Sequence, residues 1–77
     1  MVNAYILVQT NVGKAAEVVR AVREIEGVVL AEDVTGPYDV IVRAEAESVD
    51  QLGQLVISKV GAVPGITRTV TCPVVNV

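Results

Sequence analysis

The hydrophobic pattern of this chain changes period several times within 77 residues, and the order of those changes restricts the fold more than any other feature. Residues 1–9 form an apolar run rich in β-branched side chains, which predicts a buried strand. Residues 10–14 predict a turn, and from Ala15 onward apolar residues recur at helical spacing. Gly27 is expected to end this helix as a left-handed C-cap. The predicted buried face of the helix consists of Ala15, Val18, Val19, Val22 and Ile25.

The middle of the chain predicts a hairpin. Residues 28–35 and residues 38–46 are both rich in β-branched apolar side chains, which predicts a second and a third strand. Gly36 and Pro37 lie between them, and so short a turn favours antiparallel pairing of the two strands.

A second helix is predicted to begin at Ser48, because residues 48–51 have the spacing of a capping box. Gly61 and the Pro-Gly pair at residues 64–65 are expected to end it. Residues 66–75 then predict the last strand. The predicted buried stripe of this helix consists of Val49, Leu52, Leu55, Val56 and Val60.

The resulting order, β-α-β-β-α-β, predicts an α+β fold of the ferredoxin-like type. In this sandwich a four-stranded antiparallel sheet carries two helices on one face. We therefore predict a single domain over residues 1–77.

Both faces of the predicted sheet are apolar, although helices cover only one of them. In the first strand, one face carries Ala4, Ile6 and Val8 and the other carries Tyr5 and Leu7. In the second strand, one face carries Val28, Leu30 and Val34 and the other carries Val29 and Ala31. In the third strand, Val40 and Val42 share one face and Ile41 lies on the other. An exposed apolar sheet of this size exceeds what soluble monomers tolerate. With one cysteine and no histidine, the chain can form neither an internal disulfide nor a structural zinc site. We therefore predict a dimer that forms through the helix-free face; the alternative is that some of these residues are ordinary surface valines.

Charge and residue types exclude several classes of function. The net charge is −3 and the six basic residues are scattered, so the chain offers no surface suited to nucleic acid. It has no export signal and no apolar run that approaches about 18 residues, so we expect no membrane partner and a cytoplasmic location. Cys72 has no histidine to activate it and is expected to be a small buried side chain. We predict that the protein is not an enzyme and requires neither a metal nor another cofactor.

One cluster of residues has the chemistry to bind a small zwitterion. Residues 35–39 (TGPYD) place backbone N–H groups, an aromatic ring and a carboxylate at the hairpin tip. An amino acid needs a carboxylate for its ammonium group, and N–H or hydroxyl donors for its own carboxylate. Hydroxyl donors alternate along the last strand at Thr67, Thr69 and Thr71. Ordinary turn chemistry and the ordinary β propensity of threonine explain the same residues without a ligand, so both interpretations stay open here.

The same segments resemble a known family of regulators. The runs TGPYDVIV (residues 35–42) and PGITRTVT (residues 64–71) are similar to two motifs of the effector-binding domain, or RAM domain, of the Lrp/AsnC transcription regulators. The resemblance covers essentially the whole chain and implies the same α/β sandwich. It also implies that sheets pair to form dimers, that dimers assemble into rings such as octamers, and that an amino acid or similar small effector binds between dimers. Carried over by position, the effector-binding residues are Gly36, Tyr38, Asp39, Thr69 and Thr71.

The chain departs from the family pattern at its start. Full-length members carry an N-terminal helix-turn-helix domain, whereas this chain begins directly in the first predicted strand. We therefore expect a stand-alone effector domain that makes no direct contact with nucleic acid. The leading hypothesis is an oligomeric sensor of an amino acid or a related metabolite. The alternative is an interaction module that co-assembles with full-length Lrp/AsnC regulators and modulates their DNA binding without a ligand.

Overall fold

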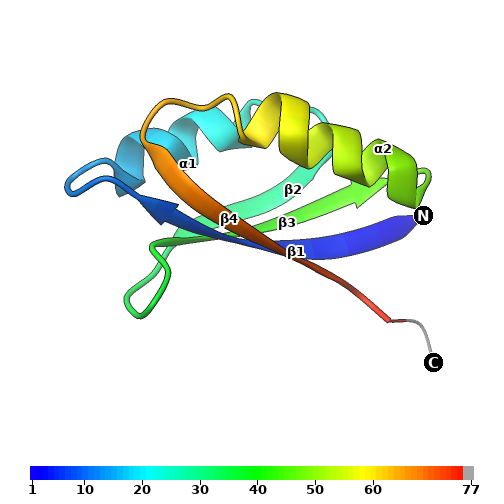
Figure 1. Ribbon diagram of the computed structural model, residues 1–77, viewed down its shortest axis with the longest axis horizontal. Helices are drawn as coiled ribbons and strands as arrows, with labels where there is room; N and C mark the ends of the chain where they lie inside the picture. Colours follow the sequence, from blue (N-terminus) through cyan, green and yellow to red (C-terminus); the bar gives the residue numbers. More distant parts are fainter. Residues whose placement is uncertain (76–77) are drawn as a thin grey trace.

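The computed structural model describes residues 1–75 and has two layers, with the helices covering one face of a four-stranded sheet (Figure 1). The elements follow the predicted order β-α-β-β-α-β, so the ferredoxin-like fold is confirmed. The second helix consists of an α-helical part followed by a π-helical part, η1. The elements are β1 (Val2–Thr10), α1 (Ala15–Arg23), β2 (Val28–Asp33), β3 (Val40–Ala46), α2 (Val49–Gln54), η1 (Leu55–Val60) and β4 (Ile66–Pro73).

The sheet has the strand order β2-β3-β1-β4, and each neighbouring pair is antiparallel. β1 therefore lies between β3 and β4, while β2 and β4 form the two edges. Val8 illustrates the arrangement, because it pairs with Val40 on one side and with Thr69 on the other. The loop that joins β2 to β3, residues 34–39 and called the hairpin loop below, projects beyond the sheet at the end where β1 finishes (Figure 1).

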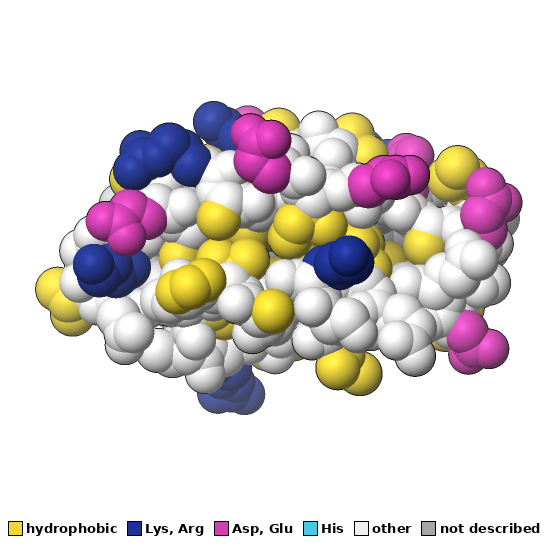
Figure 2. All heavy atoms as spheres, turned by 90° about the horizontal axis from the view of Figure 1, so that it is seen from above, with side chains coloured by type: hydrophobic (Ala, Val, Ile, Leu, Met, Phe, Trp, Pro, Cys, Tyr) yellow, Lys and Arg dark blue, Asp and Glu magenta, His cyan; other side chains and the backbone are white. Residues whose placement is uncertain are grey.

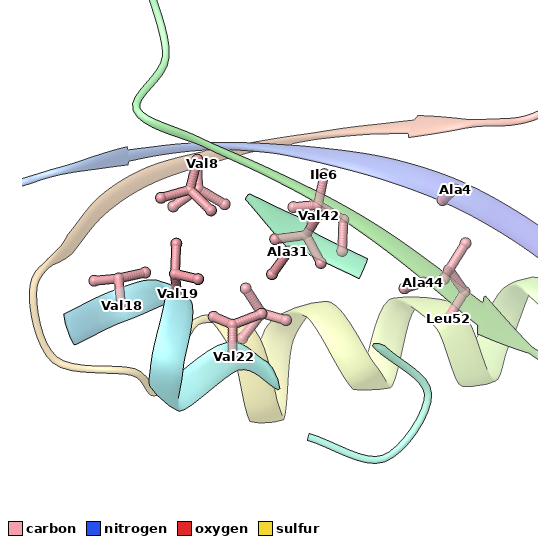
Figure 3. Packing of buried hydrophobic residues seen from close by; sticks show 12 residues of the cluster. Ala4, Ile6, Val8, Val18, Val19, Val22, Ala31, Val42, Ala44 and Leu52 are labelled. Atoms are coloured by element: carbon pink, nitrogen blue, oxygen red, sulfur yellow. The ribbon is translucent and has the colours of Figure 1, made fainter. Parts of the chain in front are cut away.

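The hydrophobic core fills the space between the sheet and the helices (Figure 3). Alternate residues of β1 and β3 point toward the helices, and the apolar side of α1 points back toward the sheet. This arrangement confirms Val18, Val19 and Val22 on the buried face predicted for the first helix. The buried hydrophobic residues are Ala4, Ile6, Val8, Val18, Val19, Val22, Ala31, Val40, Val42, Ala44, Leu52 and Val60.

The second helix begins at Ser48 in the way that the sequence predicts. The Gln51 N–H donates to Ser48 Oγ at 3.2 Å, and the Glu47 N–H donates to Gln51 Oε1 at 3.2 Å. The Ser48 half of the predicted capping box is formed, whereas the Gln51 side chain accepts from Glu47, one residue before the N-cap. At the other end, the Gly61 N–H donates to the Val56 carbonyl at 2.8 Å, a bond over five residues that is typical of a π-helix.

The first helix ends earlier than the sequence predicts. Its last residue is Arg23, and Gly27, with a φ of +98°, lies in the turn that follows. The left-handed conformation predicted for Gly27 is confirmed, but it completes this turn and not the helix itself. Arg23 connects the helix end to the sheet, because its Nε and Nη2 donate to the Ala31 carbonyl at 3.1 and 2.8 Å.

The alternation predicted for the second strand is wrong. Ala31 is buried on the helix side and Val28 packs against the core, whereas Leu30 is 43% exposed. The pairing of β2 with β3 shifts register between Val28 and Leu30. Such a bulge inserts one residue into the strand, so the alternation of faces reverses beyond it.

Two further predictions fail at the edge formed by β4. Val49, expected in the buried stripe of the second helix, is 66% exposed, and Cys72, expected to be buried, is exposed. Leu52 and Val60 of the same stripe are buried as predicted. The sheet ends at β4, so within residues 1–75 nothing covers the side of α2 on which Val49 lies. No helix in this part of the chain is long and apolar enough to cross a membrane.

Candidate functional site

The hairpin loop is an extension of the sheet and is fixed at its base by backbone hydrogen bonds. The Val34 N–H donates to the Asp39 carbonyl at 2.8 Å, which joins the two ends of the loop. The Asp39 N–H donates to the Val8 carbonyl at 2.9 Å, which joins the loop to β1. The predicted effector-binding residues Gly36, Tyr38 and Asp39 therefore occupy a defined position at one end of the sheet.

The Asp39 side chain also holds the loop against β1. Its Oδ2 accepts a hydrogen bond from the Thr10 N–H at 2.8 Å, which leaves Oδ1 available to another donor. Beside it, the Gln9 Nε2 donates to the Pro37 carbonyl at 3.0 Å. Sequence reasoning missed the roles of Gln9 and Thr10, because their partners lie 28 and 29 residues away and no local pattern signals such contacts.

Gly36 gives the loop an open backbone surface. Its φ is +146°, a conformation that residues with a side chain rarely adopt, and a Cβ at this position would meet nothing within 4 Å. The requirement for glycine is therefore set by the backbone conformation and not by crowding. Apart from its chain neighbours Thr35 and Pro37, no residue crowds the position that a side chain of Gly36 would take.

Replacing Gly36 with alanine is expected to destabilise the domain by about 1–2 kcal/mol, because the strained φ is retained in a loop held at both ends. Gly53 is the matched control: it lies inside α2, and a Cβ there would also meet nothing within 4 Å. Gly53→Ala is expected to stabilise the domain by about 0.5–1 kcal/mol, because alanine is the better helix former. Urea unfolding of both variants measures the difference, and equal changes would contradict the assigned role of Gly36.

The two predicted threonine sites lie on the helix side of the edge strand β4. Thr69 pairs with Val8 and Thr71 pairs with Ile6, and directly opposed residues of an antiparallel pair share a face of the sheet. Val8 and Ile6 are buried under the helices, which places both threonines on that side. Thr67 has no directly paired residue on β1, because it lies where the pairing of β1 and β4 shifts register.

β1 separates the hairpin loop from the threonines. Asp39 bonds to Val8 from one side and Thr69 pairs with Val8 from the other, so these two predicted residues are two strands apart. Thr71 lies two residues further along β4, away from the loop. The structure brings Gly36, Tyr38 and Asp39 together in one loop, but no residue of that loop lines either of the two hollows described next.

The larger hollow is an open crevice of about 790 Å³ at the opposite end of the sheet from the hairpin loop. It lies between the end of α1, the start of β2, the end of β3 and the second helix. Its charged residues are Glu24, Glu26, Glu45, Glu47 and Lys59. The sequence analysis singled out none of these glutamates, because they come from separate segments of the chain and form no motif.

The smaller hollow is an apolar groove of about 240 Å³ between the second helix and β4. Val49 and Ile57, which are largely exposed, line it together with Pro73, and Thr71 contributes the one hydroxyl among its lining residues. Figure 2, which looks onto the helices, shows hydrophobic atoms exposed on this side of the molecule, with most of the charged side chains toward its border. Thr71 thus lies in different surroundings from Asp39.

The sheet surface that points away from the helices, called the helix-free face, carries the largest set of uncovered apolar strand residues. Leu7 lies at its centre, paired with Ile41 on β3 and Val70 on β4. Tyr5, 40% exposed, lies next to it, paired with Arg43 and Cys72. The apolar members of this face are Tyr5, Leu7, Leu30, Ile41, Val70 and Cys72.

Comparison with known sequences establishes the family. Residues 3–77 match the sequence profile of the Lrp/AsnC ligand binding domain. The chain belongs to this family. It is 29% identical over 68 residues to the HTH-type transcriptional regulator FL11 of Pyrococcus abyssi (strain GE5 / Orsay). That alignment covers 88% of this Lrp/AsnC domain and 44% of FL11, so the domain spans less than half of the regulator.

Solved structures share the fold of this Lrp/AsnC domain. TTHA0845 from Thermus thermophilus superposes with a TM-score of 0.93 at 25% identity, over 100% of this chain and 96% of that one. FFRP-DM1 superposes with a TM-score of 0.91 at 35% identity, over 97% and 100% of the two chains. The transcriptional regulator NMB0573 from Neisseria meningitidis, solved as its L-Met complex, gives 0.85 at 19% identity, over 97% of this chain and 50% of that one. At that identity the likeness to NMB0573 shows the fold alone.

Membership of the family indicates which kind of site to look for in this Lrp/AsnC domain. The family is a ligand-binding domain of transcription regulators and not an enzyme family. Three regions carry the residues that were predicted for binding or assembly: the hairpin loop, the helix-side threonines and the helix-free face.

Proposed function

We propose that this domain binds an amino acid or a similarly small zwitterion, and that it does so as a dimer formed through the helix-free face. The observation that carries the proposal is the hydrogen bonding of the Asp39 carboxylate in a chain of the Lrp/AsnC family. One carboxylate oxygen is fixed by the Thr10 N–H, the other is available, and the open backbone of Gly36 lies in the same loop. A fixed carboxylate beside free main-chain donors suits a ligand that carries both an ammonium and a carboxylate group.

A single subunit does not enclose such a ligand. The hairpin loop and the threonines Thr69 and Thr71 are separated by β1, and the loop lines neither hollow of the chain. A second subunit is needed to turn the hairpin loop into a closed site, so we place the ligand between subunits. The L-Met complex of NMB0573 supports an amino acid as the ligand class, because that regulator contains the same fold.

The dimer accounts for the apolar residues of the helix-free face. Leu7, Ile41 and Val70 form a continuous row across three strands, and neither helix covers them. Pairing two such faces removes this row from water and adds stability to a small domain. Further assembly of dimers into rings such as octamers would bring hairpin loops of different dimers together, and a ligand at that contact would then favour the ring by mass action.

Regulation of transcription is the proposed output. FL11 is an HTH-type transcriptional regulator of which this chain spans less than half, so the activity of the whole regulator is not assigned to this domain. We propose that ligand-dependent assembly of the domain controls its contacts with other proteins of the regulatory system, full-length Lrp/AsnC regulators among them.

The test is isothermal titration calorimetry against the twenty amino acids, with light scattering to follow the oligomer. Asp39→Asn keeps an oxygen that accepts from the Thr10 N–H but removes the charge, whereas Asp39→Ala removes both. We expect Asp39→Asn to retain the stability of the wild type and to weaken binding of the active amino acid at least about tenfold, because it loses a charge-assisted hydrogen bond. Asp39→Ala is expected to lose binding and also about 1 kcal/mol of stability.

Two results count against the proposal. Absence of heat and of any change in mass across the whole panel would leave the domain without an amino-acid ligand. Binding that is unchanged in Asp39→Asn would remove the carboxylate from the ammonium site, even if an amino acid binds elsewhere.

A further inference from the structure

A basic side chain without an ionic partner lies at the same end of the sheet as the hairpin loop. Arg68 is the third residue of β4 and is exposed. The one ion pair among residues 1–75 joins Lys14 to Glu17, so Arg68 has no carboxylate partner in this part of the chain. An exposed arginine is ordinary by itself. Its surroundings therefore decide whether it can bind a ligand.

The register of the sheet places Arg68 beside Gln9 on the helix-free face. The two residues pair directly across β1 and β4, and the Cβ atoms of such a pair lie about 5 Å apart on one face. Their chain neighbours Val8 and Thr69 are also paired, and Val8 is buried beneath the helices. Successive residues of a strand alternate between faces, so Gln9 and Arg68 point away from the helices.

Gln9 connects the position of Arg68 to the hairpin loop. The loop leans toward the side of the sheet away from the helices (Figure 1), and there the Gln9 Nε2 donates to the Pro37 carbonyl at 3.0 Å. On the β3 side of β1, the Asp39 carboxylate is held by the Thr10 N–H at 2.8 Å. A carboxylate, an amide and a guanidinium therefore follow one another across this end of the sheet, on Asp39, Gln9 and Arg68.

The two charged members of this row are separated by the width of β1. Adjacent strands lie about 4.8 Å apart, so β3 and β4 are roughly 10 Å from each other. The ammonium and the α-carboxylate of an amino acid are attached to one carbon atom, so Asp39 and the main chain of Gly36 account for both groups within the loop. Arg68 is then left for an anionic group further along the ligand.

We propose that Arg68 binds the side-chain carboxylate of the ligand, so that the domain selects an acidic amino acid, glutamate or aspartate. The inference rests on the proposed amino-acid site at the hairpin loop. A guanidinium group has two parallel N–H donors that match the two oxygens of a carboxylate, and a ligand with an apolar end leaves them without an anion. Arg68 lies at the rim of the helix-free face, two residues from Val70, so a second subunit on that face can shield the pair from water and strengthen it.

Calorimetric titration with L-glutamate, L-aspartate, L-glutamine and L-asparagine tests the inference, because each amide has nearly the shape of its acid but carries no side-chain charge. The acid that fits the site is expected to bind at least about tenfold more tightly than its amide, owing to the charge-assisted pair. Arg68→Met is expected to remove this preference by weakening the acid and not the amide, whereas Arg68→Lys keeps the cation and part of the preference. Arg20→Met removes the same charge from the exposed side of α1 and is the control, expected to leave both constants unchanged.

The outcomes separate this inference from the function on which it rests. A domain that binds none of the twenty amino acids overturns both. Binding of a neutral amino acid, but of neither acid, overturns the acidic ligand and leaves the proposed function intact. Equal weakening of acid and amide in Arg68→Met assigns the guanidinium to the α-carboxylate and also overturns the acidic ligand. Circular dichroism of each variant checks that the subunit stays folded, which is expected because Arg68 is exposed.

Discussion

Replacing Ile6 with alanine is expected to destabilise the domain by about 2–5 kcal/mol, the cost of emptying a fully packed site in a hydrophobic core. Ile6 is wholly buried on the helix side of β1, opposite Val42 on β3 and Thr71 on β4. Because β1 has a neighbour on both sides, the strand cannot move to fill the space. A domain of this length is stable by only roughly 4–11 kcal/mol, so the substitution removes a large share of the total.

The measurement is urea unfolding followed by circular dichroism at one fixed protein concentration, because dimer formation adds stability by mass action. Val12→Ala is the control: Val12 lies in the turn between β1 and α1, and its side chain is fully exposed. It is expected to change the stability by no more than about 0.5 kcal/mol. If Ile6→Ala costs no more than Val12→Ala, the core has been assigned to the wrong face of β1.

Local patterns predicted the helices and strands in the correct order, because neighbouring residues form the pattern that marks each of them. The cap at Ser48 and the left-handed conformation of Gly27 are both properties of a few consecutive positions. The change from helical to strand period is equally local, so the order of elements and the fold followed from the sequence. The core of β1 and β3 followed as well, since regular alternation holds through both strands.

The errors arose where the burial of a side chain depends on a neighbouring element of the fold. Val28 and Leu30 were wrongly predicted to share a face, because the bulge between them is a property of the pairing of β2 with β3. Val49 lies on the correct stripe of its helix, but the stripe extends past β4, where the sheet ends. A helical pattern shows which residues share a side; it does not show how far the covering sheet reaches.

The candidate site could be predicted only as two separate groups. The hairpin motif predicted a loop with an open glycine and a carboxylate, and Gly36 and Asp39 have these properties. How the loop lies relative to Thr69 depends on the strand order, which puts β1 between them.

Replacing Leu7 with glutamate is expected to weaken self-association at least about 100-fold, because an ionised carboxylate would be buried in an apolar contact without a partner, twice per dimer. Leu7 lies at the centre of the helix-free face, between Ile41 and Val70. Its side chain points away from the core, so the subunit is expected to keep its secondary structure. Sedimentation equilibrium over a range of protein concentrations measures the effect.

Ile57→Glu is the matched control because it adds the same charge at another exposed apolar residue. Ile57 is 78% exposed on η1 and lines the groove beside β4, on the other side of the sheet. If the helix-free face forms the dimer, Ile57→Glu associates like the wild type. Equal weakening in both variants would point to general charge repulsion, and dissociation of Ile57→Glu alone would move the interface to the groove. Because the two variants share one net charge, their difference reports which side of the sheet meets the second subunit.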